Sequence, residues 1–144
     1  MKLYLTAFAA FALPLFGGGF HLNVKPASAS QDARAKNAAI VAILSGCHEA
    51  DKGTVTATAE GVVDGTRKTL PLKVIVLNQP GWFAVERQWP ESGRWVVVLS
   101  ARHPAFSAPT ITAVPIVENA PQFSRSKYEN KRPLSEAEFA LLLK

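Results

Sequence analysis

The residue types best suited to chemistry gather in one short stretch, which runs from Ile43 to Glu49 and reads ILSGCHE. It contains Cys47, the single cysteine of this 144-residue chain, followed directly by His48 and Glu49. Thiolate and imidazole groups are good ligands for copper or zinc, and a carboxylate can add an oxygen ligand. The stretch therefore has three interpretations: a metal or thiol site, a lipid-attachment site, or the end of a strand without chemistry.

The metal interpretation needs ligands from more than one segment. Neighbouring side chains of an extended strand point to opposite faces, so Cys47 and His48 can hold one ion only if they lie in a loop. His103 is the other histidine expected in the exported chain, and the candidate ligands for copper or zinc are Cys47, His48 and His103. We favour the simpler interpretation of a strand-end cysteine and a solvated histidine, with no bound cofactor.

The lipid-attachment interpretation rests on Leu44-Ser45-Gly46-Cys47, which matches a Leu-small-small-Cys pattern. The apolar run before it, Ala38–Leu44, has only seven residues and lies behind a better export signal. Cleavage there would also remove the most apolar strand candidate. We therefore expect an unlipidated protein.

The first 29 residues have the features of a signal peptide. Lys2 precedes an uncharged apolar run, Leu3–Phe16, which is too short for a membrane span, and Ala27-Ser28-Ala29 offers the small-x-small pattern that signal peptidases accept. The segment between this run and Ala29 is longer than usual. The sequence predicts cleavage after Ala29, a mature chain that starts at Ser30 without a stable membrane span, and a periplasmic or secreted location.

Composition limits what the mature chain can be. About 115 residues suit one domain. Lys2 and Lys25 leave with the leader, so 14 Lys and Arg face 11 Asp and Glu, and these charges are too dispersed for nucleic-acid binding. A single cysteine excludes an internal disulfide framework. No catalytic motif is present, and adjacent Cys and His rarely form a nucleophile pair, so we do not expect an enzyme.

Hydrophobic residues alternate with a period of two between regularly spaced turn signals, which is typical of an all-β domain. Asp64-Gly65 is a favoured hairpin turn, and Pro71 marks a sheet edge or a bulge. Within 66–78, the alternation places Leu70, Leu72, Val74 and Val76 on one inward face. Six strands are predicted, at 38–44, 54–63, 66–78, 82–89, 94–102 and 110–117.

The C-terminal part divides into a polar segment, 118–133, and a short helix. The polar segment is predicted to be a linker or a loose strand. Ser135 and Glu138 form a capping box, and Phe139, Leu142 and Leu143 form an apolar stripe at helical spacing. So short a helix must dock on something, either its own sandwich or the groove of a partner.

One segment carries a resemblance to a known family. PGWFAVERQWPESGRWVVVLSA, Pro80–Ala101, resembles the paired strands of small extracytoplasmic immunoglobulin-like modules of the YtkA and FixH type. In those modules an aromatic strand after Pro-Gly is followed by Pro-x-x-Gly-x-Trp and an aliphatic strand. The resemblance implies an immunoglobulin-like sandwich outside the cytoplasm. The usual membrane span of that family is missing here, and no metal-ligand motif matches, so no ligand carries over.

Counting strand directions predicts which loops meet. If each short connection reverses the chain, the stretch Cys47-His48-Glu49, the residue His103 and the turn Asn78–Gly81 lie at one pole of the sandwich. Loops at one pole are where such folds usually place binding residues. Trp82 alternates away from the inward set of its strand, so it is a candidate for an exposed contact.

The expected fold is an all-β, immunoglobulin-like two-sheet sandwich of six or seven strands, with a signal-peptide helix and a C-terminal helix. The expected boundaries are 1–29 for the leader, 30–117 for the sandwich and 118–144 for the linker and helix. The expected function is binding or structural support in the cell envelope, with an envelope protein or surface ligand as partner. Trp82, Phe139, Leu142 and Leu143 are the candidate contacts, and a periplasmic metal-binding module is the alternative.

Overall fold

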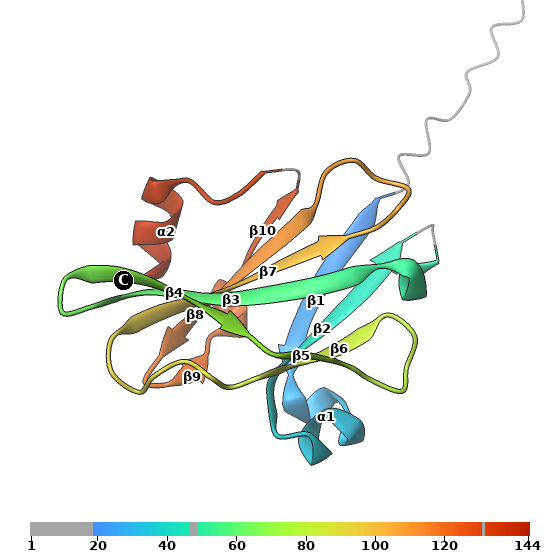
Figure 1. Ribbon diagram of the computed structural model, residues 1–144, viewed down its shortest axis with the longest axis horizontal. Coiled ribbons are helices and arrows are strands. Elements are labelled where there is room, and N and C mark those ends of the chain that lie inside the picture. The colour runs from blue at the N-terminus through green and yellow to red at the C-terminus, as the bar shows by residue number, and fades with distance from the viewer. Residues whose placement is uncertain (1–18, 47–48, 131) are drawn as a thin grey trace, which may run out of the picture.

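The computed structural model describes residues 19–46, 49–130 and 132–144, and these form two antiparallel sheets packed face to face (Figure 1). The first sheet has the order β1-β2-β6-β5, and the second has the order β10-β8-β7-β3-β4, with β9 paired to β8. The strands are β1 (Phe20–Pro26), β2 (Ala38–Gly46), β3 (Thr54–Val63), β4 (Thr66–Leu72), β5 (Val74–Val76), β6 (Trp82–Glu86), β7 (Arg94–Arg102), β8 (Thr110–Val117), β9 (Ala120–Pro121) and β10 (Lys127–Asn130).

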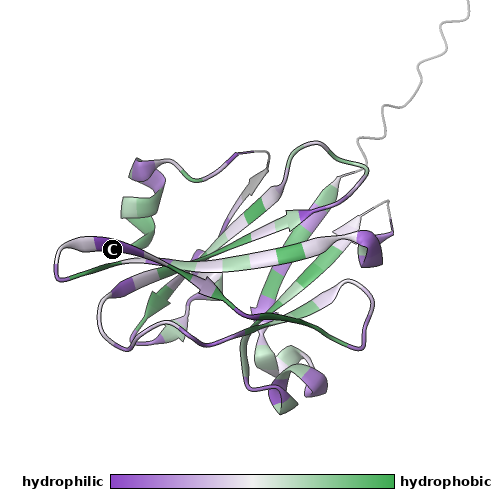
Figure 2. Ribbon diagram, in the orientation of Figure 1, coloured by the Kyte–Doolittle hydropathy of each residue, from purple (hydrophilic) through white to green (hydrophobic). Residues whose placement is uncertain are grey.

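Short helical segments connect or follow these strands. Two are α-helices, α1 (Gln31–Ala35) and α2 (Glu136–Leu142), and three are 3-10 turns, η1 (Ala27–Ala29), η2 (Ala50–Lys52) and η3 (Phe123–Arg125). Figure 2 shows hydrophobic residues recurring along β1 and β2 and a hydrophilic η2 turn at the end of the sandwich. Among the described residues, no helix has the length and apolar character needed to cross a membrane.

The strand order confirms the predicted immunoglobulin-like sandwich. An immunoglobulin domain places its strands A, B, E and D in one sheet and G, F and C in the other, with C′ added beside C in some types. Taking β1 to β8 as A, B, C, C′, D, E, F and G reproduces both sheets in chain order. The strands β9 and β10 extend the second sheet beyond its G strand.

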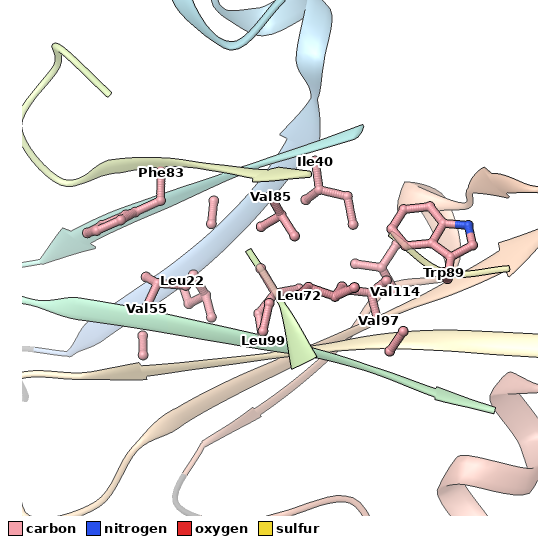
Figure 3. Packing of buried hydrophobic residues seen from close by; sticks show 14 of the residues in the cluster. Leu22, Ile40, Val55, Leu72, Phe83, Val85, Trp89, Val97, Leu99 and Val114 are labelled. Atoms are coloured by element: carbon pink, nitrogen blue, oxygen red, sulfur yellow. The ribbon is translucent and has the colours of Figure 1, made fainter. Parts of the chain in front are cut away.

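The core lies between the sheets and follows the predicted alternation (Figure 3). Trp95, Val97, Leu99 and Ala101 on β7 all face inward and are buried, as expected for a half-buried strand. The buried indole of Trp95 keeps its hydrogen bond, because its Nε1–H donates to the carbonyl oxygen of Ser92 at 2.8 Å. The ring of Trp95 is therefore buried in an apolar core without leaving its N–H group unpaired.

Two local predictions about turns and edges are confirmed. Asp64 and Gly65 both have positive φ, 50° and 73°, as a two-residue hairpin turn of this type requires. Pro71 lies on β4, the last strand of its sheet, where a missing N–H costs no ladder bond on the outer side.

The predicted strand 66–78 is wrong as a single element. The chain leaves one sheet after Leu72 and enters the other at Val74, so β4 pairs with β3 whereas β5 pairs with β6. The regular apolar alternation hides this crossing, because it continues across Lys73 without a break in period. The strand predicted to run through Trp89 also ends earlier, at Glu86.

The sandwich begins before the predicted boundary at Ser30. Phe20–Pro26 forms β1, which pairs with β2 over seven positions from Phe20↔Gly46 to Pro26↔Ile40. The side chains of Phe20 and Leu22 are buried in the core. These residues are a structural strand, so the domain boundary moves to Phe20, and the predicted leader helix falls mostly on residues outside those described.

The polar segment 118–133 also contributes to the sandwich and is not a simple linker. Within it, β9 pairs with the end of β8, and β10 pairs with the start of β8 from Lys127↔Ala113 to Asn130↔Thr110. Of the two predicted forms, the strand is the correct one for these residues. Its polar composition is compatible with a strand at the edge of a sheet.

Candidate functional site

The described loops that were predicted to share one pole of the sandwich do lie together. Glu49 and His103 meet there, with 3.0 Å between the Nε2 atom of His103 and the carbonyl oxygen of Glu49. The turn before β6 lies at the same end, because the N–H of Leu44 donates to the carbonyl oxygen of Gly81 at 2.8 Å. Cys47 and His48 lie outside the described residues, and their place in this pole stays a prediction.

His103 fastens two loops of this pole together. Its Nδ1 atom accepts a hydrogen bond from the N–H of Ala105 at 3.1 Å, so the ring proton resides on Nε2, which donates to Glu49. The imidazole is buried at 6 % exposure and packs against the rings of Phe20 and Phe106, at centroid distances of 5.1 and 5.7 Å. Its role in this geometry is structural.

This geometry bears on the metal interpretation. A metal ligand needs a ring nitrogen with an available lone pair, and His103 uses the lone pair of Nδ1 and the proton of Nε2 on backbone groups. The described residues contain no group of three His, Cys, Asp or Glu placed to hold an ion. Binding of copper or zinc by Cys47, His48 and His103 would require His103 to release one of its backbone partners.

The C-terminal helix docks on its own sandwich, which was one of the two predicted alternatives. Ser135 and Glu138 form the predicted capping box. Phe139 is buried at 5 % exposure on the outer face of the second sheet with Val96 and Ala113, and Leu142 and Leu143 pack around it. Phe139 is therefore covered by the sheet, whereas Leu142 and Leu143 stay partly exposed beside it, and their role as contacts remains a prediction.

Charged side chains hold α2 in place. Glu138 forms ion pairs with Lys127 at 2.6 Å and with Arg132 at 2.9 Å, and these two cations lower the pKa of its carboxyl group far below the usual range. The guanidinium of Arg67 lies 4.2 Å above the ring of Phe139 and pairs with Glu60 and Glu136. The helix is thus part of the folded domain.

Trp82 lies on the outer face of the first sheet, as its alternation predicted. It pairs with Ile43 of β2 and packs on an apolar cluster that includes Leu77 and Ala84. Ala33 of α1 belongs to the same cluster, so the helix covers part of this face. Trp82 is consequently half-buried, and it borders the strand β5.

An apolar groove opens beside β5, at the seam where the two sheets separate. The chain leaves β4 after Leu72, so the first residues of β3, Thr54–Thr56, extend beyond the β4 pairing that starts at Ala57. The groove between this part of β3 and β5 has a volume of ≈ 300 Å³. Its lining consists of Asp51, Gly53, Thr54, Val55, Val74, Val76, Pro80, Gly81 and Phe83.

The outer edge of β5 offers backbone hydrogen-bonding groups. The N–H of Leu77 donates to Trp82, and the carbonyl of Lys73 accepts from Glu86, so the odd-numbered residues face β6. In an antiparallel ladder the intervening residues point the other way. The N–H and C=O groups of Val74 and Val76 therefore point away from β6, and β5 is the last strand of its sheet.

Among the described residues, two longer sheet edges carry groups that oppose strand addition, and the three-residue strand β5 carries none of these groups. The edge strand β4 carries Pro71 and the charged side chains of Arg67 and Lys68, which oppose strand addition. The edge of β1 is sealed by the hydroxyl groups of Thr110 and Thr112, which donate to carbonyls of that strand. On β5, the side chain of Val76 is 70 % exposed, the largest exposed fraction among the described large apolar residues.

Sequence reasoning missed this edge because it placed Val76 on an inward face. Val76 does point to the core side of its sheet, but the described strands of the second sheet leave it 70 % exposed after the chain changes sheets at Lys73. The signal available in the sequence was Pro71, which marked an edge close to the crossing.

Comparison with family models, curated proteins and solved structures gives no match for this chain. The relationship to the YtkA and FixH type thus rests on the segment Pro80–Ala101 alone and remains a prediction. Functional inference has to come from the chemistry and geometry of the chain itself.

Proposed function

We propose that this protein is an exported, non-catalytic immunoglobulin-like module that binds an extended segment of another envelope protein as an added strand beside β5. The observation that carries the proposal is the unprotected edge of Val74–Val76 next to an apolar groove. Strand addition to an exposed edge is a common mode of peptide recognition. Backbone hydrogen bonds supply affinity in this mode, and pockets for alternate side chains supply specificity.

The surroundings of β5 fit both faces of such a segment. Side chains on one face would enter the groove against Val55 and Phe83, and side chains on the other would lie beside Ile75 and the half-buried Trp82. Asp51 lies at the groove, is exposed, and forms no ion pair with a described residue. The preferred partner segment therefore has apolar residues two positions apart and a Lys or Arg that reaches Asp51.

The chemistry of the described residues supports a binding role over a catalytic one. The two carboxyl groups with lowered pKa values, Asp32 and Glu138, owe the shift mainly to hydrogen bonds with surface cations. Neither belongs to the lining of the groove, and such ion pairs hold elements of structure together. Among the described residues that line the groove, Asp51 is the carboxylate and none is a histidine.

The metal-binding alternative has weaker support. The contact between His103 and Glu49, the residue that follows Cys47 and His48 in the sequence, favours this alternative. The hydrogen bonds between both ring nitrogens of His103 and the backbone argue against metal binding by this residue. Metal analysis of protein purified from its native compartment tests this alternative directly, since bound copper or zinc would favour it.

Site-specific photo-cross-linking tests the strand-addition proposal. A photoreactive residue placed at Val76 in the full-length chain should cross-link, in intact cells, to a partner whose mapped segment is extended and alternates apolar side chains. The matched control is Leu141, which is 60 % exposed but lies on α2, on the other sheet. Equal cross-linking from both positions would contradict the proposal.

A proline substitution separates backbone pairing from side-chain contact. Val76→Pro removes an N–H that points away from β6, so the native ladder stays intact while strand addition loses a donor. We expect Val76→Pro to abolish capture of the partner identified by cross-linking. Val76→Thr keeps the N–H and the shape of the side chain and should retain most of it. Full capture by the proline variant would overturn the proposal.

A further inference from the structure

We infer that the leader is removed by hydrolysis of the Gly19–Phe20 peptide bond, so that the mature protein begins at Phe20 and keeps β1. This inference rests on the export part of the proposed function. It replaces the site after Ala29 that the small-residue pattern alone suggests.

Removal of β1 would take away one wall of the sandwich. This strand lies beside β2 (Figure 1) and pairs with it along seven positions, and it places Phe20 and Leu22, at 5 % and 2 % exposure, in the core between the sheets. Without it, β2 would become a sheet edge. The buried side chains that pack against Phe20 and Leu22, including Leu44, would face solvent.

The opposite sheet is also built to receive β1. The Oγ1–H of Thr110 donates to the carbonyl of Phe20, and the Oγ1–H of Thr112 donates to the carbonyl of Leu22, both at 3.1 Å and both buried. The hydroxyl of Tyr128 also reaches the carbonyl of Phe20, at 3.4 Å. A chain starting at Ser30 would lose these hydrogen bonds, and it would uncover the two threonine hydroxyl groups together with the core.

The sequence offers a second cleavage pattern at the right place. Gly17-Gly18-Gly19 puts small residues three positions and one position before the bond to Phe20, and it follows the apolar run Leu3–Phe16 directly. Ala29 lies 13 residues beyond Phe16, and β1 occupies the interval between them. The glycine pattern thus satisfies the peptidase and leaves every described strand on the mature chain.

The reaction is an ordinary hydrolysis that needs no further reactant than water. The carbonyl carbon of Gly19 gains a hydroxyl oxygen from water, and its bond to the nitrogen of Phe20 breaks. The leader leaves with a carboxylate at Gly19, and the mature chain starts with an ammonium group at Phe20. The catalyst is the signal peptidase of the exporting membrane, which acts on the unfolded chain during translocation.

The test uses the full chain with its own leader in a bacterium that exports it. Intact mass and N-terminal sequencing of the exported protein should identify Phe20 as the first residue. Gly19→Leu should block this cut, whereas Ala29→Leu, at an exposed residue of η1, should leave the terminus at Phe20. Reading total cell protein after a short pulse keeps a poorly folded product visible.

The outcomes separate this inference from the proposed function. A terminus at Ser30, or a block by Ala29→Leu but not by Gly19→Leu, would overturn the inference and leave export intact. An uncleaved chain retained in the cytoplasm would overturn both the inference and the export that it rests on. Binding at β5 is read independently by cross-linking from Val76.

Discussion

Truncation of Leu22 to alanine should destabilise the folded protein strongly. The side chain is 2 % exposed in the centre of β1 and belongs to the main core cluster. Loss of its three outer carbons forfeits roughly 2.4 kcal/mol of burial at about 0.8 kcal/mol per carbon, and the cavity left behind adds to this. We expect a loss of about 3 kcal/mol in the free energy of unfolding, which for a domain of this size lowers Tm by about 10 °C.

The matched control is Asn23→Ala on the same strand. Asn23 points outward, and its amide reaches only the exposed hydroxyl of Ser45, at 3.1 Å, so this change should stay within about 0.5 kcal/mol. Urea unfolding of protein purified after export measures both variants. Wild-type stability in Leu22→Ala would refute the reasoning, because it would mean that β1 is absent from the mature fold.

Three further predictions concern other parts of the domain. Phe139→Ala should lower the free energy of unfolding by about 3 kcal/mol because it removes the ring that α2 buries against the sheet, whereas Leu141→Ala on the exposed side of that helix should lower it by less than about 0.5 kcal/mol. Urea unfolding measures both variants, and equal effects would contradict internal docking. Arg132 and Lys127 lower the pKa of Glu138 in the folded protein, so the unfolded chain takes up the proton first and the free energy of unfolding should decline as the pH falls below about 4.5. Glu138→Gln should be less stable at neutral pH, and its stability should depend less on pH in the acid range. A dependence on pH parallel to that of the wild type would refute this pairing. His103→Ala should lower Tm by the same amount with and without a chelator, because the ring of His103 is hydrogen bonded to backbone groups. A chelator that lowers the Tm of the wild type would instead support the metal site.

Local sequence signals predicted the parts of the fold that depend on neighbouring residues. The turn at Asp64-Gly65 and the strand before it, Thr54–Val63, are determined by backbone preferences within a few residues, and both were predicted correctly. The capping box of α2 is equally local. The shared pole of Glu49 and His103 followed from counting strand directions, with 66–78 counted as one pass although the chain changes sheets within it.

Elements that depend on distant partners were missed or misassigned. The strand β1 has only a short alternation of its own and lies among residues that look like a leader, and its partner β2 comes later in the chain. The strand β10 is polar, and pairing with β8 determines its structure. The groove beside β5 arises where two sheets part, a relation between strands that no single segment of sequence encodes.

The hydroxyl contacts of Thr110 and Thr112 also determine when the molecule can fold. Each joins residues 90 positions apart, and Tyr128 reaches back 108 positions to Phe20. Contacts of such long range form late and slow the folding of β-sandwiches. If the chain crosses a membrane from its N-terminus, as we propose, most of its length must emerge before β1 reaches its final place. Slow closure would then keep the chain unfolded during passage and leave an interrupted product without a stable structure.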